Sequence, residues 1–416
     1  MTTLQHPAPA GGMGDIDGRA AWLRMVVCLA LATIGGAGMW SMVVVLPAVQ
    51  AEFAVERAAA SLPYTAMMVG FAAGNVFFGR AIDRFGAALP LAAAAVMLSS
   101  GFAVASLSAS LWQFLLVQGL LIGLGSSASF GPLLADISHW FVRRRGIAVT
   151  GVACGNYVAG ALWPLAMQPM LEAGGWRFAY LMIGLICLVT MLPLCLMLRR
   201  RLPEAANDAG AGVPGAGLLS AGMSPATLQG LLIVAGIGCC VAMSMPQVHI
   251  VAYCVDLGFG VARGAEMLSL MVGAGIVSRL VSGVFADRIG GARTLLIGSA
   301  GQMLALFLYL PFDGLVSLYV VSLVFGLAQG GIVPMYAIMV REYMPAREAG
   351  ARVGTVIMAT IAGMALGGWL SGAIYDMTGS YQAAFLNGIA WNALNLAVIC
   401  FILWRSRPRN LTRTMA

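Results

Sequence analysis

The sequence contains no lysine, so all 23 of its basic residues are arginine. This absence excludes a phosphate site built on a P-loop lysine and an enzyme whose pyridoxal phosphate forms a Schiff base with lysine. Charge is scarce as well, since 9% of the 416 residues are charged, whereas a soluble domain carries about 25%. With 60% hydrophobic residues and a mean hydropathy of +0.90, the chain has too little polar surface for a soluble enzyme, a nucleic-acid module or a disordered scaffold.

Motifs of catalysis and metal binding are also absent. The chain has no HExxH or GxSxG motif and no pair of aspartates at membrane depth, which rules out the common hydrolase chemistries. Its eight cysteines fall in or beside apolar runs without CxxC spacing, and we interpret them as small hydrophobic helix residues. We therefore expect a protein that is not an enzyme and that holds neither a cofactor nor a metal.

Long apolar runs make up most of the sequence. A hydrocarbon core about 30 Å thick is crossed by roughly 20 apolar residues in a helix, and charges and turn residues divide the chain into twelve runs of this kind. The sequence predicts an all-α membrane protein with twelve transmembrane helices in two pseudo-symmetric six-helix bundles. The predicted spans are residues 22–50, 60–82, 88–108, 111–138, 146–170, 176–198, 227–254, 265–286, 292–311, 314–340, 351–375 and 382–404.

The arginines are distributed unevenly between the two sides of this predicted bundle. With both termini in the cytoplasm, 19 of the 23 lie on the cytoplasmic side, only Arg57, Arg177 and Arg263 lie outside, and Arg279 lies within a span. Positively charged loops stay on the cytoplasmic side of membranes. We expect a multi-pass protein of the cell inner (plasma) membrane, in contact with the lipid bilayer. The net charge of +7 reflects this topology, so we expect no nucleic-acid partner.

The longest internal polar stretch lies between the sixth and seventh predicted spans. Its sequence, RRRLPEAANDAGAGVPGAG, is rich in Gly, Ala and Pro, which is typical of a flexible linker. The predicted organisation is a disordered cytoplasmic tail (1–20), an N-terminal six-helix bundle (21–200), a cytoplasmic linker (201–225), a C-terminal six-helix bundle (226–405) and a basic cytoplasmic tail (406–416).

An internal repeat relates the two predicted bundles. The loop after the second span reads GRAIDRFG and the loop after the eighth reads GVFADRIG, so the pattern G-x-x-x-D-R-x-G occurs twice, 204 residues apart. Glycine lets helix ends approach, aspartate accepts hydrogen bonds from a neighbouring helix N-terminus, and arginine anchors the interface. Internal repeats of this kind are typical of transporter folds. The motif residues predicted to form a conformational latch are Gly79, Asp83, Arg84, Gly283, Asp287 and Arg288.

Because the two copies occupy equivalent loops of a twelve-span chain, the sequence resembles the major facilitator superfamily, apart from the tails and the linker. A narrower resemblance is to the monocarboxylate-transporter-like branch of that superfamily, which includes relatives of the oxalate and formate exchangers. It implies the transport of small organic carboxylates. The segments that carry it are GGAGMWSMVVVLPAVQAEF (35–53) with SLPYT (61–65), FVRRRGIAVTGVACGNYVAG (141–160), MPQVHIVAYCVDLG (245–258) and SRLVSGVFADRIG (278–290).

The sequence departs from this branch at three places. Animal members carry an aspartate one turn before the arginine of the eighth span, where this chain has Gly275. Oxalate exchangers of the branch place a second cation in the eleventh span, but residues 353–372 contain none. Their acidic signature in the first span is also missing. Because the usual acidic proton site is absent, proton symport and anion exchange both stay open.

Arg279 is the central candidate for substrate binding. It lies eight residues before Asp287, roughly 12 Å deep at about 1.5 Å per residue, where burial of an arginine costs about 3 kcal/mol. Snorkelling is one alternative, although this depth exceeds the comfortable reach of the side chain. An internal ion pair is the other, but no Asp or Glu lies in the central part of any predicted span. A bound anion would supply the counter-charge, and the guanidinium fork matches a carboxylate.

Four further polar residues are predicted to contribute to this substrate site. Asn156 and Tyr157 lie near mid-depth in the fifth span, and Gln329 and Tyr336 flank Pro334 in the tenth. An amide or a phenol at this depth completes the shell of a carboxylate or reads a hydroxyl group. The alternative for each pair is a structural contact that ties helices together.

Three residues nearer the outer side are candidates for other roles. His249 is predicted to couple protons or to gate the outer vestibule, with a hydrogen-bonded structural histidine as the alternative. Trp40 and Tyr64 lie near the outer ends of the first two spans and are interpreted as gate or membrane-interface residues.

The sequence therefore favours a secondary transporter for a small organic anion, with one intramembrane cation pointing to a monocarboxylate. We expect a small carboxylate substrate, a monomer, and protons as an open second partner. A drug or cation exporter of the same superfamily is an alternative, although such a protein places a carboxylate in the membrane cavity. A transporter-like sensor that binds without moving its solute is another.

Overall fold

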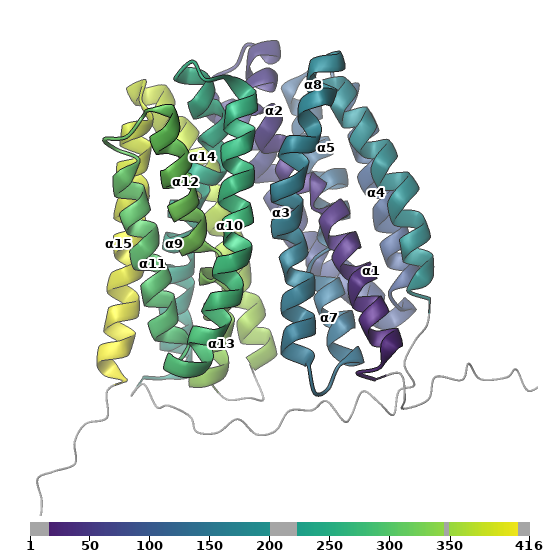
Figure 1. The fold of residues 1–416 in the computed structure, drawn as a ribbon, viewed down its shortest axis with the longest axis vertical. Helices are drawn as coiled ribbons and strands as arrows, with labels where there is room; N and C mark the ends of the chain where they lie inside the picture. The colour runs from purple at the N-terminus through teal and green to yellow at the C-terminus, as the bar shows by residue number, and fades with distance from the viewer. Residues whose placement is uncertain (1–15, 200–222, 345–348, 407–416) are drawn as a thin grey trace, which may run out of the picture.

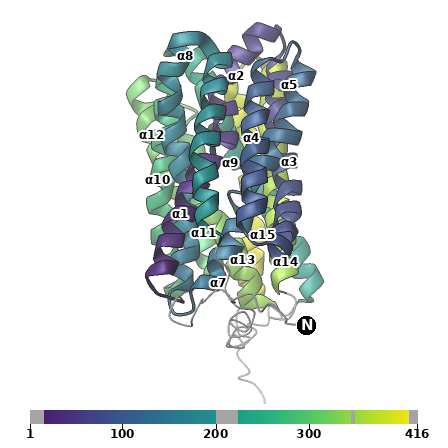
Figure 2. The ribbon, with the colours of Figure 1, turned by 90° about the vertical axis from the view of Figure 1, so that its right-hand side faces the viewer.

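The computed structural model describes residues 16–199, 223–344 and 349–406. Every regular element in these ranges is helical, and the long helices run roughly parallel to one axis in two perpendicular views (Figures 1 and 2). Eleven helical segments are long and apolar enough to cross a membrane. One of them, α8 (Arg145–Met197), leaves helical geometry at Gly174 and Gly175 and turns back there, so it supplies two crossings. The twelve predicted spans are thereby confirmed.

The first half of the molecule contains six crossings. Its first crossing is divided at Gly36 and its fourth is divided into several pieces, whereas the fifth and sixth are the two arms of α8. Its elements before α8 are α1 (Arg19–Gly35), α2 (Ala37–Phe53), α3 (Arg57–Phe85), α4 (Ala88–Ser106), α5 (Leu111–Val117), the π-helical η2 (Gln118–Gly123), α6 (Leu124–Ser127) and α7 (Gly131–Trp140).

The second half also contains six crossings, of which one, the fourth of this half, is divided into two helices. Its elements are α9 (Pro225–Asp256), α10 (Gly260–Ile289), α11 (Gly291–Leu308), α12 (Leu315–Gln329), α13 (Ile332–Tyr343), α14 (Ala349–Thr378) and α15 (Tyr381–Arg405).

The two halves lie side by side, the first in purple to blue and the second in green to yellow (Figure 1). We call the end of the bundle at which α1 begins and α15 ends the tail face, and the opposite end, where α3 begins, the far face. Parts of the predicted tails and of the predicted linker, residues 1–15, 200–222 and 407–416, lie outside the described residues.

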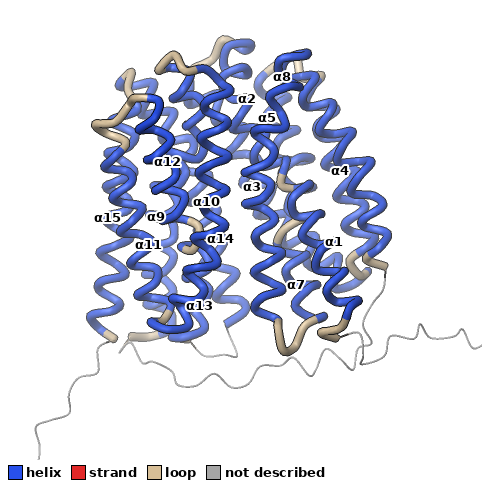
Figure 3. Tube along the Cα trace, in the orientation of Figure 1, coloured by secondary structure: helices blue, strands red, loops and turns tan. Residues whose placement is uncertain are grey.

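Equivalent crossings of the two halves are interrupted at equivalent places. Between α6 and α7, Phe130 has φ −125° and ψ −92°, and between α12 and α13 the chain passes through Gly330 and Gly331; loop segments interrupt the helices inside the bundle (Figure 3). Pro132 and Pro334 follow these breaks within the first turns of α7 and α13. Proline suits a first turn because the amide hydrogen that it lacks has no helical partner there.

The halves touch each other most extensively along two antiparallel helix pairs, α3 with α14 and α8 with α10, and α2 also contacts α9. Toward the far face these pairs are packed so tightly that a Cβ added to certain glycines would crowd the opposite half. These glycines are Gly160 (2.6 Å from Val272), Gly275 (2.4 Å from Tyr157), Gly368 (3.0 Å from Tyr64) and Gly372 (3.0 Å from Ala58).

Toward the tail face the same helix pairs separate. A Cβ added to any of four glycines there would meet no described atom within 4 Å; these are Gly79 on α3, Gly354 on α14, Gly146 on α8 and Gly283 on α10. The halves are therefore in close contact toward the far face, whereas these four glycines toward the tail face have no close neighbour.

Candidate functional site

Arg279 lies on α10 where the two halves meet. Its side chain is 8% exposed. Nε donates to the carbonyl of Gly330 (3.2 Å) in its own half, and Nη1 donates to the carbonyl of Ala153 (3.1 Å) on α8 of the other half. It makes no ion pair with an acid among the described residues. The two carbonyl groups accept two of its five N–H hydrogens and do not neutralise its charge, so the guanidinium stays available to an anion.

Tyr157 covers one face of this guanidinium, with the Arg279 Cζ 4.2 Å from the centre of its ring. The ring reaches that position because the residue opposite is Gly275, where any Cβ would lie 2.4 Å from it. The space beside Gly275 is therefore filled by an aromatic ring. A cation–π contact of this kind stabilises the charged arginine without cancelling its charge.

Asn156 lies beside Tyr157 and is partly exposed. Its Nδ2 approaches the sulfur of Met39 (3.8 Å), while its main-chain carbonyl accepts a hydrogen bond from Trp40 Nε1 (3.0 Å). Trp40 is buried and, from α2, packs against Gly160. The structure thus brings Asn156, Tyr157 and Arg279 to one region of the inter-half contact and places Trp40 behind it.

Gln329 and Tyr336 lie deeper in the second half, and both side chains are fully buried. Tyr336 donates to Asn395 Oδ1 (2.8 Å) on α15. Gln329 accepts from Gln247 Nε2 on α9, while its own Nε2 has no hydrogen-bond partner among the described residues. Because Gln329 directly precedes Gly330, its contact with α9 also fixes the carbonyl that holds Arg279.

A cluster of charged and polar residues joins the two halves at the far face; its arginine is buried and its two acids are more exposed. Arg57 of α3 forms a two-pronged ion pair with Asp256 of α9 (3.0 and 3.1 Å) and also donates to the hydroxyl of Tyr381 on α15. The carboxylate of Asp376 on α14 accepts from the amides of Arg57 (2.9 Å) and Ala58 (2.7 Å). We call Arg57, Asp256, Asp376, Tyr381 and their neighbour His249 the far-face cluster.

His249 is fully buried within this cluster. Its Nδ1 lies 3.1 Å from the Tyr381 hydroxyl and its Nε2 lies 2.7 Å from the carbonyl of Gly368. Tyr64 of α3 packs against the same Gly368 from the other half. Two of the three residues predicted for gating, His249 and Tyr64, therefore lie at the contact that closes the far face, whereas Trp40 lies behind Arg279.

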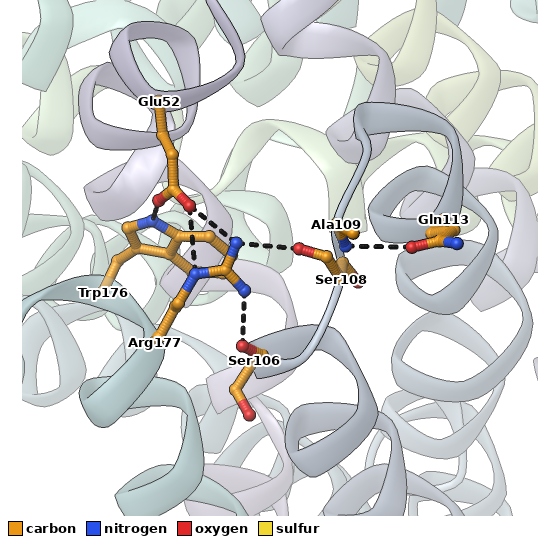
Figure 4. Close-up of polar contacts among 7 residues, drawn as sticks. All are labelled: Glu52, Ser106, Ser108, Ala109, Gln113, Trp176 and Arg177. Carbon is orange, nitrogen blue, oxygen red and sulfur yellow. Dashed lines mark hydrogen bonds and ion pairs between the residues drawn. The ribbon is translucent and has the colours of Figure 1, made fainter.

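The sequence analysis missed the far-face cluster, although a signal for it was present. The predicted topology places few arginines on the far face, and each of the three that lie there pairs with an acid. The pairs are Arg57 with Asp256, Arg177 with Glu52, and Arg263 with Glu266. Arg177 also donates to the carbonyls of Ser106 and Ser108, and its neighbour Trp176 donates to Glu52 (Figure 4). An arginine predicted to lie at the far face thus indicates an ion pair with a specific acidic side chain.

The residues of the repeated motif lie at the tail-face ends of α3 and α10. Gly79 and Gly283 face open space, Asp287 and Arg288 are exposed, and Arg84 lies over the ring of Phe85 at 5.2 Å. The side chain of Asp83 lies outside what the structure describes. Where it is described, the motif makes no hydrogen bond or ion pair between the halves.

The chain matches the model of the Major Facilitator Superfamily over residues 28–325 and 267–415. It is 29% identical to monocarboxylate transporter 13 of Bos taurus over 341 residues, covering 79% of this chain and 78% of that protein. It is 28% identical to monocarboxylate transporter 11 of Homo sapiens over 405 residues, covering 92% and 82%. It is also 30% identical to the MFS-type transporter pytF of Aspergillus terreus over 225 residues, covering 52% and 72%.

A solved structure shares the same fold. It is a bacterial homologue of the human lysosomal transporter Spinster in an inward-facing and occupied conformation, with a TM-score of 0.71 and 12% identity over 95% of this chain and 98% of that one. The matched family, the twelve crossings and the repeated motif agree. The chain belongs to the Major Facilitator Superfamily, a family of membrane transporters and not of enzymes.

Proposed function

We propose that the chain is a secondary transporter of a small organic anion, a monocarboxylate, and that Arg279 binds the carboxylate. The observation that carries this proposal is a buried arginine at the contact between the two halves that has no acidic partner among the described residues. Family members named monocarboxylate transporters among its relatives support the substrate class.

The neighbours of Arg279 favour an anion with a single carboxylate. One guanidinium neutralises one charge, and no second cation contacts it within the described residues. Tyr157 supplies an aromatic wall, and the amide of Asn156 is proposed to bind a hydroxyl or oxo group of the substrate. Gln329 and Tyr336 are proposed to act indirectly, by holding the helix break beside Gly330 and the packing of α13 on α15.

Transport is proposed to proceed by alternating access. The halves are in close contact at the far face, and opening that face would require the cluster around Arg57 to separate. The tail face is proposed to be the side from which the site is reached in this conformation. Trp40, Tyr64 and His249 are proposed gate residues. The tail face, rich in arginine, is proposed to lie in the cytoplasm beneath the plasma membrane. A monomer suffices, because one chain supplies both halves of the site.

Replacing the central arginine tests this function. Arg279→Gln should weaken binding of lactate, pyruvate or formate more than about a hundredfold, because charge-assisted hydrogen bonds contribute roughly 1.5–3 kcal/mol each. The matched control is Arg263→Gln, which removes an exposed arginine paired with Glu266 and should leave binding unchanged. The measurement is the thermal shift of the purified protein with each acid, followed by uptake of the labelled acid into proteoliposomes.

Other outcomes identify the alternatives. Full anion binding by Arg279→Gln contradicts the assigned site. Binding without flux in the unsubstituted protein identifies a sensor, and dye efflux without carboxylate binding identifies a drug exporter. Arg279→Lys keeps the charge but lacks the planar fork, so it should bind at least about tenfold more weakly than the arginine protein and serves if the glutamine variant does not fold.

A further inference from the structure

The hydrogen bonds of the far-face cluster fix the protonation state of His249. The carbonyl of Gly368 can only accept a hydrogen bond, so His249 Nε2, 2.7 Å away, must carry a hydrogen. The Tyr381 hydroxyl, 3.1 Å from Nδ1, has one hydrogen to give. Its oxygen already accepts a hydrogen bond from the Arg57 guanidinium.

Among the described residues, Nδ1 of His249 is the one acceptor within hydrogen-bond distance of the Tyr381 hydroxyl. Tyr381 therefore donates its single hydrogen to Nδ1, and Nδ1 must be unprotonated to accept it. The chain of donors runs from Arg57 to Tyr381, then to His249, and ends on the carbonyl of Gly368. Each of these three hydrogen bonds therefore has a fixed direction. The cluster is complete when the imidazole is neutral and carries its hydrogen on Nε2.

We infer that His249 is a proton-binding site whose occupation opens the far face, because the cluster closes only around the neutral imidazole. A proton on Nδ1 would turn this nitrogen into a donor aimed at a phenol oxygen that already accepts from a cation. The hydroxyl hydrogen of Tyr381 would lose its acceptor, and two positive charges would share one buried oxygen. Burying an unpaired polar group and repelling charges both disfavour the closed form.

The cluster joins the two halves, so weakening it loosens the contact that keeps the far face shut. Arg57 belongs to the first half, whereas Asp256, Gly368 and Tyr381 belong to the second. Among the described residues, the titratable and charged groups around His249 come from all four packed helices: Arg57 and Tyr64 on α3, Tyr253 and Asp256 on α9, Tyr375 and Asp376 on α14, and Tyr381 on α15. Within this group of side chains, only His249 is of a type that ordinarily titrates between pH 5 and 8.

The size of the effect follows from linkage. Opening the far face exposes His249 to water, where an imidazole titrates near pH 6.5. A proton that binds the open form and not the closed form raises the open-to-closed ratio about 30-fold between pH 7.5 and pH 5.0. The inference concerns the gate and not the cargo, so it holds for any solute that the protein carries.

Two spin labels on far-face loops measure this opening directly. Ala109 in the first half and Asp313 in the second are exposed, and Cys400 is the exposed cysteine of the described chain. In a Cys400→Ser background, labels on Ala109→Cys and Asp313→Cys give the distance across the far face by pulsed dipolar spectroscopy of the full-length protein. We expect a long-distance population that grows as the pH falls from 7.5 to 5.0.

Replacing the histidine separates this mechanism from other acid effects. Glutamine offers an amide donor for Gly368 and an oxygen acceptor for Tyr381 but does not titrate, so His249→Gln should keep the closed distance at both pH values. The matched control is His139→Gln, at the tail face, which should retain the full response. Distances that do not change with pH in the unsubstituted protein overturn the inference, as does a full pH response in His249→Gln. Tyr381→Phe, which removes the shared hydroxyl, should also lose the response and serves if the glutamine variant does not fold.

Discussion

Asn75 and Arg279 occupy equivalent positions in the two halves, each four residues before the glycine of its G-x-x-x-D-R-x-G motif. Asn75 Oδ1 accepts from the amide of Gly131 (3.0 Å) at the start of α7, and Arg279 Nε donates to the carbonyl of Gly330 (3.2 Å) just before α13. Each side chain therefore holds the break in the neighbouring helix. In the second half the same position also supplies the intramembrane cation.

Asn75→Leu should destabilise the protein because it leaves the amide of Gly131 without an acceptor. Because this hydrogen bond is partly buried, we expect a loss of about 1 kcal/mol, the lower end of the cost of an unpaired buried donor. Asn75→Asp keeps an acceptor oxygen at the same place and is the matched variant, so it should lose less than half as much. Thermal unfolding in detergent measures both. Equal losses in the two variants would show that the contact with Gly131 is not what holds α7.

Gly275→Ala should displace Tyr157 from the guanidinium, because an added Cβ would lie 2.4 Å from the ring. Gly273→Ala is the matched control on the same helix, since its Cβ would lie 3.6 Å from Ala161 in ordinary contact. We expect the first variant to weaken carboxylate binding at least about fivefold, through the loss of a cation–π contact of roughly 1 kcal/mol or more, and the second to bind unchanged. Isothermal titration with the preferred carboxylate decides the matter.

The double variant Gly275→Ala with Tyr157→Ala checks the cause. If the crowded ring is responsible, removing the ring should make the alanine at position 275 harmless, so the double variant should resemble Tyr157→Ala alone. Additive losses would place the effect of Gly275 elsewhere, for instance in the packing of α10 on α12.

Apolar runs and arginine placement predicted the twelve crossings because a span needs only enough apolar length, a property that each segment carries by itself. The repeat predicted the relation between the halves in a similar way, because the two copies of the motif, with Asp83 and Asp287, can be found by comparing two segments of the sequence. The depth of Arg279 also follows from counting along one helix. None of these inferences requires knowing which helices touch.

The partners of Arg279 could not be predicted, because two of them are main-chain carbonyls, at Gly330 and Ala153, which every residue has. The sequence did contain signals for the aromatic partner, because position 275 carries glycine where an acid is expected and Tyr157 is itself a candidate site residue. Their apposition depends on how α8 packs against α10. The far-face cluster likewise joins Arg57 to Asp256, 199 positions later in the chain, and only the tertiary fold brings them together.

Asp256→Asn should loosen the far face, because it removes the charge that pairs with Arg57 between the halves. Breaking the pair leaves the buried guanidinium of Arg57 without its main counter-charge, although the Asp256 side chain is 27% exposed and solvent reduces the loss. Glu52→Gln is the matched control, since it breaks an ion pair on the same face within one half and should leave the gate closed. The far-face spin-label distance should lengthen in the first variant only. Lengthening in both would mean that general destabilisation, and not the inter-half pair, opens the gate.

Asp17 anchors the segment before α1 to the loop that precedes α8. Its carboxylate accepts hydrogen bonds from the amides of Val142 (3.3 Å), Arg143 (3.0 Å) and Arg144 (3.4 Å). The hydrogen bond from the Arg143 amide is the largest cause that lowers the pKa of Asp17 below its ordinary value of 3.8, and the other two amides add to it. The carboxylate is largely exposed, so we expect a local anchor worth about 1 kcal/mol, as for a helix cap.

The pH dependence of this anchor has a definite sign. A carboxyl group whose pKa is lower in the folded state stabilises that state above its unfolded pKa, and the contribution disappears as the pH falls through the folded value. Hydrogen exchange of the amides of Val142, Arg143 and Arg144, corrected for the intrinsic rate, should therefore lose protection in a step below about pH 4. Asp17→Ala should lack both the protection at pH 7 and the step, whereas Asp17→Asn, which keeps an acceptor oxygen but cannot titrate, should keep part of the protection and show no step. A step that persists in the asparagine variant would assign the titration to another group.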